Sequence, residues 1–241
     1  MAVMELNALS INLSGSFSAT VYLPENVAFT SSTPALYPVL YLLHDTGGDE
    51  TDFRSWKNLE RIATEQKLFI VAPGIAHSMG QDLTYGAKYG RFLAEELPGI
   101  CSHLFPVDPH GATIGGVGTG AYGAVMLALQ HPEQFARCIT FNGVFDLATL
   151  CETALRQTQA RGLTVPMLQA VFGPLDAVRG SAKDALFEIA RYPQAALYLG
   201  CEDACPDWEE SVQFARQANC PVQMAPCVEM LLQQALGQVA N

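Results

Sequence analysis

The chain has 241 residues, 49% of them hydrophobic and 15% charged, so it is long enough to bury a sizeable core as one domain. Its formal net charge of −11 opposes contact with phosphate backbones and anionic lipid, which argues against nucleic acid and membrane surfaces as partners. No stretch reaches the roughly 18 unbroken apolar residues of a membrane span, and the N-terminus lacks the pattern of a signal peptide, so we expect a cytoplasmic protein.

Short apolar runs alternate with amphipathic stretches along the whole chain. Strands are predicted at residues 8–13, 18–24, 37–45, 68–74, 112–116, 136–143, 196–203 and 220–226. Helices are predicted at residues 55–67, 90–105, 124–131, 208–218 and 228–239, whereas residues 147–184 look mobile. This alternation predicts an α/β fold with a mostly parallel central sheet covered by helices on both faces, and function in the loops after the strands.

Seven cysteines are scattered along the chain without the paired spacing of metal ligands. An odd number of unpaired cysteines is typical of reduced thiols in a reducing compartment. The only close pair is CEDAC, residues 201–205, which has no nearby histidine or second pair. We therefore expect no metal site and no cofactor.

Residues 113–129, TIGGVGTGAYGAVMLAL, run from a predicted strand through a glycine-rich turn into a predicted helix. Gly118, Gly120 and Gly123 match G-x-G-x-x-G, the fingerprint of a dinucleotide-binding loop. That motif normally follows the first strand, and an acid about 20 residues on ends the next strand. Here about four predicted strands come first, and the next strand ends at Asn142. Nucleotide binding is therefore the weaker interpretation.

The stronger interpretation is a nucleophile elbow, G-x-S-x-G, in which a sharp turn between a strand and a helix lifts a serine above the sheet. Small residues are needed around such a turn, and Gly116, Gly120 and Ala121 meet this demand. The central position is Gly118, which has no side chain. A serine there would be strained, so we expect Gly118→Ser to lower the melting temperature.

The sequence resembles the putative esterase family of α/β-hydrolases, which includes tributyrin esterase and esterase D, and more distantly the mycolyltransferases. Four segments carry the resemblance in the family's order: YPVLYLLHDTGGDETDFRSW, IGGVGTGAYGAVMLALQHPEQFA, FGPLDAVRGSAKDALF and YLGCED. They are similar to the family's H-G-x-x-G-D loop, its G-L-S-M-G-G-Y-G-A elbow, its cap-side segment and its strand ending in G-T-E-D. The resemblance implies one α/β-hydrolase domain over residues 1–241.

The resemblance also implies roles for individual residues. Asp203 takes the place of the catalytic acid, and the backbone N–H groups of Thr46 and Thr119 take the place of the oxyanion-hole donors. Asp45 stands where the family has glycine, which places a carboxylate in the pocket close to where negative charge would develop. His44, also at the pocket, is expected to make structural hydrogen bonds rather than to act as a base.

Two essential groups of the family's reaction are absent. Gly118 occupies the nucleophile position, and matching CVEMLLQQAL to the family's H-D-W-E-F-W-D-Q-A-L places Cys227 at the histidine position. In this fold the base follows the acid in the chain, yet all five histidines precede Asp203. A cysteine without a histidine partner is more often a small buried hydrophobe. We therefore predict an esterase of carboxylic-ester hydrolase ancestry that is inactive or strongly impaired.

Two alternatives remain open. The protein could be an active ester hydrolase with a non-standard constellation that uses Asp45, Thr119 or Cys227. It could also be a non-catalytic binding or structural protein, including a homo-oligomer. The ligand class implied by the family is a small ester, an acyl group or a carbohydrate.

Overall fold

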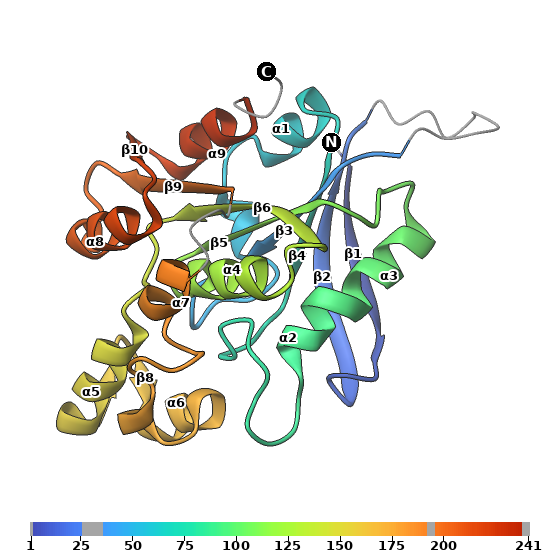
Figure 1. Ribbon diagram of the computed structural model, residues 1–241. Helices are drawn as coiled ribbons and strands as arrows, with labels where there is room; N and C mark the ends of the chain where they lie inside the picture. Colours follow the sequence, from blue (N-terminus) through green and yellow to red (C-terminus); the bar gives the residue numbers. More distant parts are fainter. Residues whose placement is uncertain (1, 26–35, 192–195, 238–241) are drawn as a thin grey trace.

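The computed structural model describes residues 2–25, 36–191 and 196–237, and eight of their strands form one sheet (Figure 1). In chain order these are β1 (Ala2–Ser10), β2 (Gly15–Leu23), β3 (Val39–Leu43), β4 (Phe69–Pro73), β5 (Ala112–Val117), β6 (Phe135–Phe141), β9 (Leu197–Glu202) and β10 (Val222–Ala225). Across the sheet the order is β1-β2-β4-β3-β5-β6-β9-β10. β2 pairs antiparallel with β1 and β4, and every pair from β4 to β10 is parallel, which confirms the mostly parallel sheet.

Helices cover both faces of this sheet, as the sequence predicted. One face packs against α1 (Leu59–Glu65) and α9 (Val228–Gly237), and the other against α3 (Leu97–Leu104), α4 (Thr119–Gln130) and α8 (Trp208–Ala218). The buried strand β3 serves both layers because side chains alternate along a strand. Its Leu40 and Leu42 belong to the core under α1 and α9, and its Tyr41 and Leu43 belong to the core under α4.

Residues 147–184, which look mobile in the sequence, fold into regular elements. They form α5 (Leu147–Gln157), a short hairpin of β7 (Gln159–Ala160) and β8 (Leu163–Thr164), and α6 (Val165–Phe172), followed by α7 (Ala185–Arg191). Asp146 caps α5 because its side chain accepts a hydrogen bond of 2.9 Å from the backbone N–H of Thr149. The signal for α5 was present as one apolar face at helical spacing: Leu147, Leu150, Cys151 and Ala154.

Glu96 fastens the β1–β2 hairpin to the helical layer. The predicted helix at 90–105 is built as α2 (Tyr89–Arg91), a π-helical turn ending at Glu96, and α3. The Glu96 carboxylate accepts hydrogen bonds from the Ser10 hydroxyl at 2.7 Å, the Ile11 N–H at 2.8 Å and the Asn12 side chain at 2.9 Å. Burial alone would raise the pKa of Glu96, but these donors outweigh it and lower the pKa.

We expect Glu96→Gln to destabilise the protein near neutral pH by about 1 kcal/mol, a reduced value because the carboxylate is largely in water. Since folding lowers the Glu96 pKa, its contribution is present above the unfolded pKa of about 4.3 and is lost as the pH falls further. Thermal melting between about pH 7 and about pH 3 should therefore show a steeper loss for the unmodified protein than for Glu96→Gln. Glu95→Gln, at an exposed neighbouring position, is the control, and equal slopes for all three proteins would contradict this role.

Candidate functional site

The glycine-rich turn lies between the end of β5 and the start of α4. Gly118 has φ +57° and ψ −121°, a conformation that residues with a Cβ rarely adopt. Its N–H donates to the carbonyl of Phe141 at 3.2 Å, and its carbonyl accepts from Val144 at 3.0 Å, so the turn is tied to the neighbouring loop after β6. The sharp turn expected for an elbow is therefore present, and glycine relieves its strain.

The other glycines of the motif allow close packing around α4. A Cβ at Gly120 would overlap the carbonyl of His44, and a Cβ at Gly123 would overlap the carbonyl of Met79. These contacts account for the spacing G-x-G-x-x-G by helix packing alone. A nucleotide is not needed to explain it.

Asp45 fills the space in which a side chain at position 118 would lie. β3 and β5 are neighbouring parallel strands, so the loop after β3 meets the turn after β5. A Cβ built on Gly118 would overlap the Asp45 carboxylate, including its carbon and both oxygens. The missing side chain of the elbow is thus replaced by a carboxylate from the adjacent loop.

One oxygen of Asp45 accepts three hydrogen bonds beside this turn. Asp45 Oδ1 accepts hydrogen bonds of 2.8 Å from the backbone N–H of Thr46, the backbone N–H of Thr119 and the Thr119 hydroxyl. The Thr119 hydroxyl in turn accepts from the Thr46 N–H at 2.9 Å and lies 2.6 Å from the Thr46 hydroxyl. Thr119 is also the first residue of α4, where the helix dipole favours an anion. The arrangement is an anion site occupied by the protein's own carboxylate.

His44 has a structural role in this loop. Its side chain is 1% exposed, and its Nε2 accepts a hydrogen bond of 2.9 Å from the backbone N–H of Ile75. The proton must then lie on Nδ1, which donates to the carbonyl of Asp45 at 2.7 Å. With both nitrogens engaged in backbone contacts, His44 positions Asp45 and is not free to accept a proton from a substrate.

Asp203, which the sequence comparison led us to expect at the acid position, makes no side-chain hydrogen bond to the described part of the chain. It follows β9, its side chain is exposed, and its backbone N–H donates to the carbonyl of Ala225 at 3.1 Å. The preceding residue is the engaged one: Glu202 accepts from the Asn142 amide at 2.7 Å and donates its N–H to the Asn142 Oδ1 at 2.9 Å. Sequence reasoning missed this pair, although Asn142 directly follows β6 and Glu202 ends the adjacent parallel strand β9.

Cys227, which we expected at the histidine position, lines a separate cleft of about 340 Å³ together with Lys57, Arg61 and Glu229. None of the elbow residues lines this cleft. Burial would raise the pKa of Glu229, but its own N–H, that of Lys57 and the Cys227 thiol donate to it, and the pKa is lowered. Cys227 is thus a neighbour of Glu229, and among the described residues its thiol makes no hydrogen bond to Asp203 or Asp45.

Burial raises the pKa of each of the other six thiols, which disfavours the reactive thiolate form. All seven cysteines are free, and burial raises the pKa of Cys101 and Cys151 to about 12 and that of Cys205 to about 11. Within residues 2–25, 36–191 and 196–237, no group of three or more His, Cys, Asp or Glu side chains could hold a metal ion. The same ranges contain no helix that is long and apolar enough to cross a membrane.

Comparison with curated proteins identifies relatives of this chain. The family model described as Putative esterase matches residues 10–201. The S-formylglutathione hydrolase of Rattus norvegicus is 26% identical over 155 residues, which are 55% of this chain and 53% of the rat protein. The chain thus spans about half the length of this curated relative.

Solved structures extend the likeness to the whole chain. FphF, a fluorophosphonate-binding serine hydrolase of Staphylococcus aureus, gives a TM-score of 0.80 at 24% identity and covers 100% of this chain and 98% of its own. The S-formylglutathione hydrolase FrmB of the same organism gives 0.79 at 24% identity, covering 100% and 99%. The carboxylesterase EstE1, cloned from a metagenomic library, gives 0.68 at 14% identity, covering 99% and 88%.

These identities are too low to transfer an activity, but the structural agreement confirms the predicted fold. The family model covers most of the chain, from the last residue of β1 into β9. The chain therefore belongs to the Putative esterase family and has the α/β-hydrolase fold.

Proposed function

We propose that this protein is a catalytically inactive or strongly impaired member of the esterase family. The observation that carries the proposal is the position of Asp45, whose carboxylate lies over Gly118 and accepts from the N–H groups of both Thr46 and Thr119. Acyl transfer needs a nucleophile at the elbow and free donors for the developing oxyanion. Here the nucleophile is missing, and the N–H groups that would bind the oxyanion are already bound to the Asp45 carboxylate.

The three candidate replacements for the nucleophile are each constrained. Thr119 is only 2% exposed, and its hydroxyl is hydrogen-bonded to the Asp45 carboxylate and to the Thr46 N–H. Cys227 lines another cleft. Asp45 has one oxygen bound by three donors, and no histidine is hydrogen-bonded to its carboxylate among the described residues. None of these residues is part of a nucleophile, base and acid constellation.

The pocket's ancestral ligand is, on this proposal, a small acyl ester or thioester, or an acylated carbohydrate. The names of the rat relative and of the Staphylococcus aureus FrmB structure point to S-formylglutathione as one member of this class. The residual rate over water would come from binding alone, since the donors are occupied. The rate enhancement over water should therefore be smaller than the factor of about 10³ to 10⁴ that a serine hydrolase keeps when only its triad is removed.

Hydrolysis of p-nitrophenyl acetate and p-nitrophenyl butyrate tests the proposal. The unmodified protein should match Asp45→Asn, Thr119→Val and Cys227→Ser, all at the rate given by a non-enzyme protein of equal concentration. A rate well above that background, abolished by one of these substitutions, would show an active enzyme with a non-standard constellation.

A further inference from the structure

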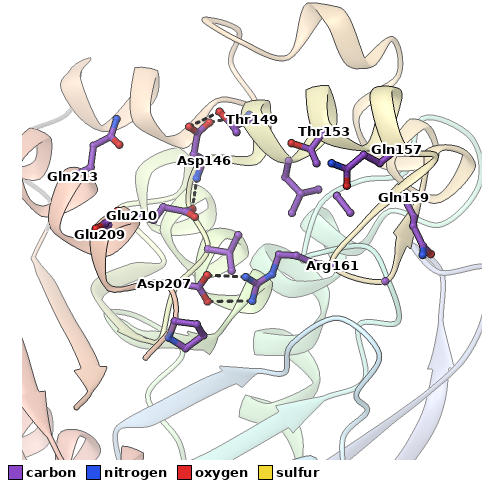
Figure 2. A pocket seen from close by; sticks show the side chains of 15 residues that line it. Asp146, Thr149, Thr153, Gln157, Gln159, Arg161, Asp207, Glu209, Glu210 and Gln213 are labelled. Atoms are coloured by element: carbon purple, nitrogen blue, oxygen red, sulfur yellow. Dashed lines mark hydrogen bonds and ion pairs between the residues drawn. The ribbon is translucent and has the colours of Figure 1, made fainter. Parts of the chain in front are cut away.

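A second cleft, separate from the elbow, lies under the segment formed by α5 and the β7–β8 hairpin. It has a volume of about 710 Å³, within the range of small-molecule sites. One wall is α5 and the hairpin, the other is the start of α8, and Val144 and Asp146 after β6 complete it (Figure 2). None of Gly118, Asp45, Thr46 or Thr119 lines it, so it is not the family's elbow pocket.

The cleft already holds one positively charged group, which the chain itself supplies. Arg161 reaches across it and binds Asp207 with two hydrogen bonds, of 2.7 Å and 3.1 Å, one to each carboxylate oxygen (Figure 2). The Asp207 side chain is only 12% exposed, whereas that of Arg161 is 41% exposed. The Asp207 carboxylate is therefore largely shielded from water, whereas the guanidinium bound to it belongs to a half-exposed side chain.

Arg161 lies in the tight turn of the β7–β8 hairpin. Arg161 and Gly162 form the two-residue turn between β7 and β8, with φ of +51° and +77°. Two positive φ angles are typical of a type I′ hairpin turn, in which asparagine or glycine is preferred at the first position. An arginine at that position is strained, so the turn is not optimised for stability alone. Asparagine or glycine could replace it without distorting the hairpin.

The rest of the lining suits a cation with further hydrogen-bonding groups. Four carboxylates and one guanidinium line the cleft, so an anion such as a phosphate or an acyl carboxylate is repelled. Two carboxylates besides Asp207 are already partnered: Asp146 by Thr149, and Glu210 by the N–H groups of residues 145 and 146. Four neutral side chains make no side-chain hydrogen bond to the described residues and are free for a ligand: Thr153, Gln157, Gln159 and Gln213.

We propose that this cleft binds a small alkylguanidine, whose guanidinium group is seated on Asp207 in exchange with Arg161. In this exchange one bidentate ion pair on Asp207 is replaced by an equivalent one, so the ligand has to overcome only the advantage that Arg161 has from being part of the same chain. The planar fork of the ligand would reproduce the two hydrogen bonds now made by Arg161. A second polar group at the other end of the ligand would meet the free amide side chains. The inference is independent of whether the elbow is active.

Isothermal titration with agmatine, which is 4-aminobutylguanidine, tests this at a low salt concentration of about 20 mM. Arg161→Gly removes the internal competitor and keeps the positive φ, so it should bind agmatine at least about tenfold more tightly than the unmodified protein. Adding Asp207→Asn should abolish that gain. The urea analogue of agmatine, equal in shape but without the positive head, should not bind. Arg161→Asn, also suited to the turn, serves as the second variant if the glycine variant does not fold.

Arg54→Gln is the matched control because it removes one positive charge from an exposed ion pair with Glu5 and does not line the cleft. It should leave agmatine binding unchanged. The proposal is overturned if neither Arg161 variant binds more tightly, if the urea analogue binds equally well, or if affinity survives Asp207→Asn. A lower melting temperature of Arg161→Gly without any gain in affinity for agmatine would show that the ion pair only stabilises the fold.

Discussion

Gly118→Ser is expected to destabilise the protein by about 2 to 5 kcal/mol, which is large for a single substitution in a turn and reflects the burial of Gly118. Part of the loss is backbone strain, because a serine at φ +57° and ψ −121° is in a region that residues with a Cβ avoid. The rest is steric, because the new Cβ would overlap the Asp45 carboxylate. Asp45 must then move, and it loses the three hydrogen bonds on its Oδ1. Chemical denaturation of the two proteins measures the difference.

Two comparisons separate the strain from the overlap. Gly47 lies in the adjacent loop with φ +88° and has no atom within 4 Å of a built Cβ, so Gly47→Ser reports strain alone. It should destabilise less than Gly118→Ser. In an Asp45→Gly background, Gly118→Ser should be less destabilising than in the unmodified protein by about 1 to 3 kcal/mol. If the two substitutions are additive, the carboxylate does not fill the space above Gly118.

The triple variant Gly118→Ser, Asp45→Gly, Cys227→His is expected to gain esterase activity that none of its parent variants shows. Catalytic residues of a triad act as a unit, so restoring the serine or the histidine singly should achieve little. The pair Gly118→Ser, Cys227→His should also stay poor, because the Asp45 carboxylate, although displaced by the new serine, remains next to the N–H groups of Thr46 and Thr119 and competes with the oxyanion for them. Losing one oxyanion donor typically lowers kcat by about 10² to 10³. We expect the triple variant to exceed the pair by at least about a hundredfold in kcat/KM.

The same assay distinguishes the causes of a failure. If the double variant Gly118→Ser, Cys227→His is as active as the triple variant, Asp45 does not hinder catalysis. Its hydrogen bonds to the N–H groups of Thr46 and Thr119 would then not explain the loss of function. If the triple variant folds but remains inert, the fault lies in the position of residue 227, which lines the cleft with Lys57 and Glu229. A serine and histidine that do not meet would then show no burst of p-nitrophenol at high enzyme concentration.

The fold could be predicted from the sequence because its signals are local and repeated. The fully buried strand β3 shows as one apolar run, and β5, the glycine turn and α4 follow one another within the stretch 113–129. The order of strands across the sheet is not visible in such patterns, and only the structure shows it. The segment 147–184 was underestimated because most of its elements are short: β7 and β8 have two residues each and α6 has eight.

The site was predicted in part. The absence of a nucleophile at Gly118 can be read directly from the residue type, and a charge near the oxyanion position was expected at Asp45. The sequence could not show that this carboxylate lies over Gly118 and accepts from both Thr46 and Thr119, because that contact joins loops 73 and 74 residues apart. The pair of Arg161 and Asp207 was missed for the same reason, as 46 residues separate its members.

The most direct test of the account is the intact mass of the unmodified protein after treatment with an alkyl fluorophosphonate, which transfers its phosphonyl group to an activated nucleophile. With no nucleophile at Gly118 and the neighbouring donors bound by Asp45, we predict no stoichiometric adduct, while the triple variant should gain one phosphonyl group on the serine at position 118. A single stoichiometric adduct on the unmodified chain, mapped to Thr119, Asp45 or Cys227, would contradict the account.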